Sequence, residues 1–167
     1  MLFSILIQQI NAQKIFRTDV LVVGASASGI AAGIQSARMG ANTIIAEPST
    51  WLGGMITAAG VCAFDGNHNL PSGIFGEFRS ALYKVYGGPS KVATGWVSNT
   101  LFEPHVGDSI FKTMVASTQH LTIQYQWQFQ KTIVDNGVIK GAAFTQTLTG
   151  EKSIVYAKQV IDATELG

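Results

Sequence analysis

A glycine-rich turn, Gly24-Ala25-Ser26-Ala27-Ser28-Gly29, joins the short apolar run Asp19–Val23 to a stretch that favours a helix. A dinucleotide-binding turn needs one glycine for its tight bend and another, five residues on, for close packing of the helix on the strand. The N–H groups and positive dipole end of that helix then face the phosphates. Gly24 and Gly29 fill both positions, so the turn predicts a site for a dinucleotide pyrophosphate.

The third position of this turn holds Ser26, where the usual pattern has a glycine that admits the pyrophosphate. The side chain of Ser26 is small, and its hydroxyl could donate a hydrogen bond to a phosphate oxygen. We therefore expect Ser26 to lie against the pyrophosphate, with Ala25 and Ser28 beside it. On this interpretation, Ser26→Gly is tolerated and Ser26→Val damages the ligand site alone.

A carboxylate follows the turn at a distance typical of ribose recognition. Glu47 ends a second apolar run, Thr43–Glu47, and dinucleotide-binding folds place an acid about 20 residues after the glycine turn. Such a carboxylate accepts hydrogen bonds from the ribose hydroxyls of adenosine and repels the 2′-phosphate of NADP. The alternative is a solvated glutamate after a strand–turn–helix unit that binds no phosphate.

Composition limits the classes of protein that the chain can represent. The 167 residues are 47% hydrophobic and 13% charged, with a net charge of +1, which predicts one folded domain and argues against a disordered chain. Nucleic-acid binding would need more basic charge. One cysteine, Cys62, excludes an intrachain disulfide, and no metal site is predicted. His68, His105 and His120 have no partner at ligand spacing.

The elements that would position these residues follow from local patterns. Residues 30–39 favour a helix that ends at Gly40, which with the two apolar runs makes a βαβ unit and predicts a parallel sheet. Residues 48–71 read as a long loop. Further helices are expected over 72–86, with Val85 on the apolar face, and over 104–117. Residues 121–157 read as an antiparallel meander that precedes a last strand, 159–163.

Residues 19–55, DVLVVGASASGIAAGIQSARMGANTIIAEPSTWLGGM, resemble the FAD-dependent oxidoreductase family with the glutathione-reductase type of FAD-binding fold. The similarity covers residues 18–167 and includes several shorter motifs: Thr57-Ala58-Ala59-Gly60, Phe64-Asp65-Gly66, Pro71-Ser72-Gly73-Ile74 and Glu103-Pro104-His105. It implies an α/β, Rossmann-like FAD-binding domain with a parallel sheet and an inserted antiparallel β-meander.

The resemblance also implies further contacts to FAD. Gly53 and Gly54 would let the backbone pass close to the pyrophosphate and ribityl chain, and Met55 would lie near the flavin ring. Ala163 and Thr164 would end a strand beside the cofactor, with Gly167 matching the glycine that follows in the family.

The function expected from these features is two-electron or hydride transfer through FAD on a small-molecule substrate. An NAD-dependent dehydrogenase and a non-catalytic nucleotide-binding module are the alternatives. No catalytic residue and no electron acceptor is assigned, and we expect the catalytic acid or base to lie beyond residue 167. We accordingly expect the domain to be truncated at its C-terminal end and inactive alone.

The first residues suggest a separate segment. Residues 1–17 read as a tail or as the remnant of a signal peptide, with a short apolar run, Leu2–Ile7, and a small residue, Ala12, at a suitable cleavage position. An additional strand or helix is the other alternative. The run is too short for a membrane span. Export to the periplasm or the medium is therefore favoured over a cytoplasmic location.

Overall fold

Six strands form one mixed sheet in the computed structural model, which describes residues 13–65, 68–70, 72–96 and 98–165. The sheet has the order β3-β2-β1-β6-β5-β4 and consists of β1 (Lys14–Val23), β2 (Thr43–Glu47), β3 (Leu121–Tyr125), β4 (Trp127–Asp135), β5 (Val138–Gln146) and β6 (Lys152–Asp162). The first four strands in this order are parallel, whereas β5 and β4 run antiparallel to their neighbours. The predicted α/β fold class with a parallel sheet and a meander is confirmed.

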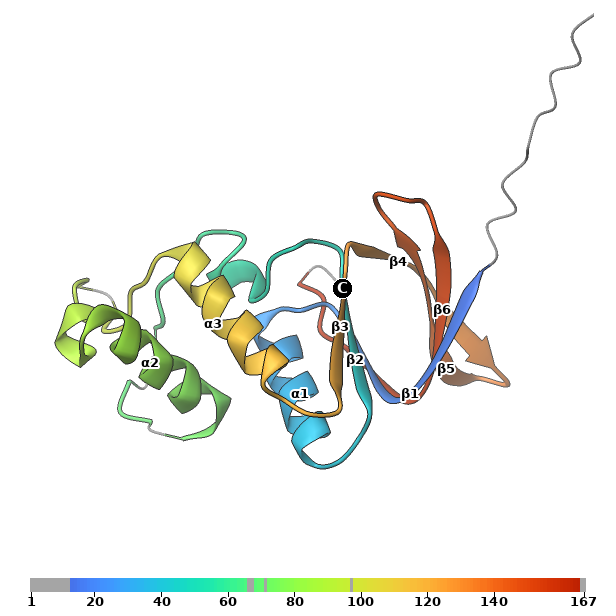
Figure 1. Ribbon diagram of the computed structural model, residues 1–167, viewed down its shortest axis with the longest axis horizontal. Coiled ribbons are helices and arrows are strands. Elements are labelled where there is room, and N and C mark those ends of the chain that lie inside the picture. The colour runs from blue at the N-terminus through green and yellow to red at the C-terminus, as the bar shows by residue number, and fades with distance from the viewer. Residues whose placement is uncertain (1–12, 66–67, 71, 97, 166–167) are drawn as a thin grey trace, which may run out of the picture.

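The last residues of β1 and the first four of β2 are buried on both faces, which explains why these segments lack polar alternation. Val22 and Ile45 belong to a core shared with the helices, whereas Leu21, Val23 and Ile44 belong to a second core shared with the meander. Figure 1 shows this layering, with the helices on one side of β1–β3 and β4–β5 on the other.

Three helices build the first core. Helix α1 (Ala27–Arg38) packs on β1 and β2, α3 (Pro104–Ala116) packs on α1 and β3, and α2 (Gly73–Tyr86) packs on α3 (Figure 1). Gly40 follows α1 with a φ of 90°, and Gly87 ends α2 with a φ of 85°, as expected for glycines that terminate helices. Val85, predicted to face the core, is exposed because α2 buries only a narrow stripe on α3.

The antiparallel strands form the second core. Asn136 and Gly137 have φ values of 48° and 76°, which is the hairpin turn predicted between β4 and β5. Trp127 packs at 5.2 Å from Phe16 and at 5.5 Å from Phe144, measured between ring centroids. These aromatic contacts hold the meander against the sheet.

Three boundaries differ from the sequence-based expectations. Residues 14–17, assigned above to the tail, continue β1 because they pair with the first half of β6. Residues 121–125, assigned to the meander, form a strand parallel to β2. The end of the predicted meander and the predicted last strand, 159–163, belong to one continuous strand, β6, which is parallel to β1 along its length and antiparallel to β5 in its first half.

Two sequence predictions concern residues outside the described part of the chain. These are the leader-like residues 1–12 and Gly167. Among the residues that the structure describes, no helix has the length and apolar character needed to cross a bilayer.

Candidate functional site

The glycine turn lies where the carboxyl ends of β1, β2 and β6 come together. The N–H of Gly24 donates to the carbonyl of Ala46 at 2.8 Å, and the N–H of Ala163 donates to the carbonyl of Val23 at 2.8 Å. Gly24 has a φ of 95°, a conformation that L-residues rarely adopt. A ligand crevice at this edge is what open parallel sheets provide.

Gly29 is required by packing, as the sequence predicts. A Cβ built on Gly29 would lie 2.2 Å from the carbonyl oxygen of Gly24 and 2.9 Å from Cβ of Ala163. A Cβ on Gly24 would lie 2.7 Å from the carbonyl oxygen of Ala163. The turn therefore holds α1 directly against the ends of β1 and β6.

Ser26 uses its hydroxyl inside the protein, which differs from the expected phosphate contact. Its Oγ donates to the carbonyl of Ala163 at 2.7 Å and accepts from the N–H of Gly29 at 3.2 Å, as the N-cap of α1. The only hydroxyl proton of Ser26 is thus given to Ala163, and the side chain is buried. Ser26 lies next to the helix N-terminus as predicted, but it links that terminus to β6.

Ser28 is the hydroxyl of the turn that remains exposed. Its Oγ lies 2.9 Å from Oγ of Ser26, to which it donates, since the Ser26 proton is already used. The N–H groups of the first turn of α1 have no helical acceptors. These N–H groups are the donors that an anion at the helix N-terminus would meet, and the exposed hydroxyl of Ser28 could join them by turning its one proton away from Ser26.

Glu47 lies at the end of β2, directly beside the turn. Its Oε2 accepts from the N–H of Ala25 at 2.8 Å, and its Oε1 accepts from the N–H of Ser49 at 2.9 Å. A carboxylate offers about four acceptor positions, so two stay available for the hydroxyls of a ribose. The structure brings Glu47 and the turn together, and Ala25 serves as the link between them.

The Gly53-Gly54 loop runs alongside the turn. Gly53 pairs with Ser26 as an isolated parallel bridge, and its N–H donates to the carbonyl of Ala25 at 2.8 Å. A Cβ on Gly53 would lie 2.7 Å from Thr57 and 2.8 Å from Phe111. Packing of the loop and a φ of 112° therefore both favour glycine at this position, and the close approach of Gly53 to the cofactor stays a prediction.

The loop leads into the short 3-10 helix η1 (Gly54–Ile56), and three of its N–H groups differ in their partners. The N–H of Leu52 donates to Oδ1 of Asp108 at 2.8 Å, and the N–H of Met55 donates to the carboxylate of Glu165. No acceptor for the N–H of Gly54 is found in the described part of the chain. Met55 itself is exposed at this edge.

Ala163 and Thr164 follow β6 and complete the edge. The side chain of Ala163 is buried against Gly29, whereas Thr164 is exposed and donates from its hydroxyl to Oδ1 of Asp162 at 2.7 Å. The backbone N–H of Thr164, followed by its hydroxyl, lowers the pKa of Asp162. This carboxylate therefore stays ionised and fixes the turn that leaves the sheet.

Two residues of the site were missed by the sequence analysis. Asp108 lies in the middle of α3, and Glu165 follows the last strand, and each binds an N–H of the Gly53-Gly54 loop. One sequence feature could have indicated the role of Asp108. It lies among the buried residues of α3, where a carboxylate needs a hydrogen-bonding partner.

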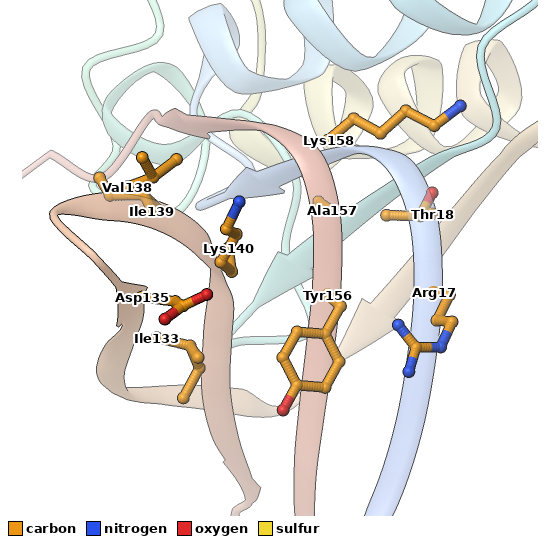
Figure 2. Close-up of a pocket in the computed structure, with 10 residues that line it drawn as sticks. All are labelled: Arg17, Thr18, Ile133, Asp135, Val138, Ile139, Lys140, Tyr156, Ala157 and Lys158. Atoms are coloured by element: carbon orange, nitrogen blue, oxygen red, sulfur yellow. The ribbon is translucent and has the colours of Figure 1, made fainter.

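A separate hollow of about 670 Å³ lies on the sheet away from this edge, and Figure 2 shows its lining. Its residues come from β1, β4, β5 and β6, and none belongs to the site described above. Arg17 lies 5.1 Å from the centroid of the Tyr156 ring, and Lys158 pairs with Asp19 at 2.7 Å. The glycine turn and this hollow are therefore distinct features.

Fold and site together define a Rossmann-like dinucleotide-binding protein. The profile of the family described as FAD dependent oxidoreductase matches residues 19–167. The chain belongs to the FAD dependent oxidoreductase family, whose cofactor is FAD. No protein with a curated description matches the chain.

Solved structures show the same fold at low sequence identity. A geranylgeranyl bacteriochlorophyll reductase-like protein from Thermoplasma acidophilum aligns with a TM-score of 0.60 and 18% identity, over 89% of this chain and 39% of that one. A 3-ketosteroid-delta4-(5alpha)-dehydrogenase from Rhodococcus jostii aligns with a TM-score of 0.53 and 16% identity, over 92% and 47%. Quinol fumarate reductase from E. coli aligns with a TM-score of 0.58 and 14% identity, over 91% of this chain and 33% of that one. The chain thus spans less than half of each of these proteins.

The residues of the site fit FAD. The first turn of α1 offers N–H donors to a pyrophosphate, and the exposed hydroxyl of Ser28 could turn toward it. On the neighbouring loop, the N–H of Gly54 has no acceptor among the residues that the structure describes. Glu47 retains acceptor positions for a ribose. These donors and acceptors come from segments that converge on one edge of the sheet, as an extended dinucleotide requires.

Proposed function

We propose that this chain is the FAD-binding portion of an oxidoreductase that transfers a hydride or an electron pair between FAD and a small-molecule substrate. The observation that carries the proposal is the convergence of the glycine turn, the Gly53-Gly54 loop and the Ala163-Thr164 turn at one sheet edge. The resemblance to the glutathione-reductase type of FAD-binding fold supports the same assignment.

The residues of the chain bind and orient the cofactor in this proposal. The N-terminus of α1 and Ser28 bind the pyrophosphate, Glu47 binds the adenosine ribose, and the backbone at Gly54 binds the segment between pyrophosphate and flavin. Ser26 keeps these parts in register by joining α1 to β6. When bound, FAD supplies the acceptor for the hydride or electron pair.

The experiment that tests the proposal is the identification of a bound chromophore. The purified protein is expected to show the visible absorbance of an oxidised flavin, and the material released on denaturation is expected to co-elute with FAD. A colourless protein that binds NAD instead would support a dehydrogenase of the NAD type. A protein that binds neither would support a non-catalytic module.

A second test concerns Glu47. Glu47→Ala is expected to weaken FAD binding by about 1–3 kcal/mol, because ribose hydroxyls and the N–H groups of Ala25 and Ser49 lose their acceptor. Flavin fluorescence titration of parent and variant measures the change. Glu77→Ala, which removes an exposed carboxylate paired with Arg38, is the control and should leave the affinity unchanged. Equal affinity in Glu47→Ala and parent would reject the assignment.

Export of the protein is also proposed. It is supported by the apolar run Leu2–Ile7 and by Ala12 in the sequence. Recovery of a chain that begins after Ala12 from the periplasm or the medium is the expected result.

A further inference from the structure

The peptide group of Leu52, which leads into the Gly53-Gly54 loop, is held from both sides. Its N–H donates to Oδ1 of Asp108 at 2.8 Å, and its carbonyl accepts from Oγ1 of Thr57 at 2.6 Å. The side chains of Leu52, Thr57 and Asp108 are all buried. The start of the loop is therefore fixed by a carboxylate that comes from α3, 56 positions along the chain.

The second oxygen of this carboxylate is also occupied. Oδ2 of Asp108 accepts from Nζ of Lys112, one turn along α3, at 2.7 Å. Nζ of Lys112 lies 6.0 Å from the centroid of the Tyr125 ring, and Tyr125 pairs with Glu47 across β2 and β3. Burial, and then the charges of Asp108 and Glu47, raise the pKa of Tyr125. Asp108 thus belongs to a charged cluster that adjoins the predicted ribose-binding carboxylate.

We propose that Asp108 is a positioning residue for the flavin, acting through the Leu52 peptide to hold the Gly53-Gly54 loop against the glycine turn. The inference rests on the proposed function. Asp108 itself does not touch the cofactor in this arrangement. Without the Asp108 carboxylate, the buried N–H of Leu52 is left unpaired. The loop then gains conformational freedom that FAD binding must remove.

The experiment compares parent, Asp108→Leu and Asp108→Asn for FAD affinity and for amide hydrogen exchange at Leu52. Leucine fills similar space but cannot accept a hydrogen bond. The amide oxygen of asparagine can still accept the hydrogen bond from the Leu52 N–H. We expect Asp108→Leu to weaken FAD binding by about tenfold and to speed exchange at Leu52 by a similar factor. Asp108→Asn is expected to restore both values to within about threefold of the parent.

A matched carboxylate supplies the control. Asp19 likewise accepts a loop N–H, that of Asn42 at 2.9 Å, and pairs with a lysine, Lys158, but it lies in the middle of β1, beside the start of β2 and outside the candidate site. Asp19→Leu should leave FAD affinity and Leu52 exchange unchanged. If it weakened FAD binding as much as Asp108→Leu, the effect would be general destabilisation and the proposal would be wrong.

The outcomes separate this inference from the proposed function. A parent protein without affinity for FAD overturns both. A parent that binds FAD, with Asp108→Leu binding equally well, overturns the inference alone. If Asp108→Leu does not fold, Thr57→Val removes the other hydrogen bond of the same peptide with little change in shape. Unchanged FAD affinity in folded Thr57→Val overturns the inference, and a weakened affinity supports it.

Discussion

Replacing Gly29 with valine is expected to abolish flavin binding and to destabilise the protein without flavin. A Cβ at this position would lie 2.2 Å from the carbonyl oxygen of Gly24, which is a backbone atom held by the sheet. Helix α1 must therefore move away from β1, at a cost of about 3 kcal/mol or more for overpacking. For a chain of this length that cost lowers Tm by roughly 6–12 °C.

Flavin released on denaturation and thermal melting of the apo protein measure the two effects of Gly29→Val. Gln35→Val is the control, because Gln35 is an exposed position of the same helix and reports only the helix propensity of valine. Retention of flavin at the parent level by Gly29→Val, or equal melting of the two variants, would show that α1 does not need this contact.

Ser26→Val is expected to lose both flavin and stability, in contrast to the effect predicted from the sequence. The hydroxyl of Ser26 caps α1 and donates to the carbonyl of Ala163, so its removal leaves Gly29 N–H and that carbonyl unpaired. A lost N-cap and an unpaired buried group together cost about 2–4 kcal/mol. Ser26→Gly keeps much of the cap preference but loses the Ala163 contact, so it is expected to fall between valine and parent.

Chemical denaturation of the apo variants tests the role of Ser26. Ser28→Ala is the matched control, since it removes an exposed hydroxyl two residues away and should leave the free energy of unfolding nearly unchanged. If Ser26→Val unfolds at the parent midpoint, the hydrogen bond between α1 and β6 contributes nothing, and Ser26 acts on the ligand alone.

The features that the sequence predicted well are those that depend on residues close together along the chain. The glycine turn, Glu47 at the end of β2 and the hairpin at Asn136-Gly137 each depend on a few adjacent side chains and on backbone geometry. The role of Asp108 depends on a partner 56 positions away, which no local pattern reveals. The hydrogen bond from Ser26 to Ala163 was missed for the same reason, because its acceptor lies 137 positions along the chain.

The pairing of β3 was missed for a different physical reason. Leu121, Ile123 and Tyr125 alternate with polar residues, a pattern typical of an antiparallel strand with one solvated face. β3 shows this alternation although it is parallel to β2, because it lies at the edge of the sheet. Hydrophobic period therefore reports the exposure of a strand and not its direction.

The long reach of β6 has a consequence for how the protein acquires its shape. Lys14 pairs with Ser153 and Val23 with Asp162, so β1 gains its partner on that side only once β6 has been made, more than 100 residues later. Folding is slow for such a pairing, because the entropy of closing the long loop is lost before the contacts between the two strands stabilise the chain. During synthesis, the glycine turn emerges early but lacks the Ala163 carbonyl that Ser26 binds. Competence to bind the cofactor is therefore acquired only after β6 has left the ribosome. A nascent chain stalled before that point would display an unpaired β1 edge to chaperones.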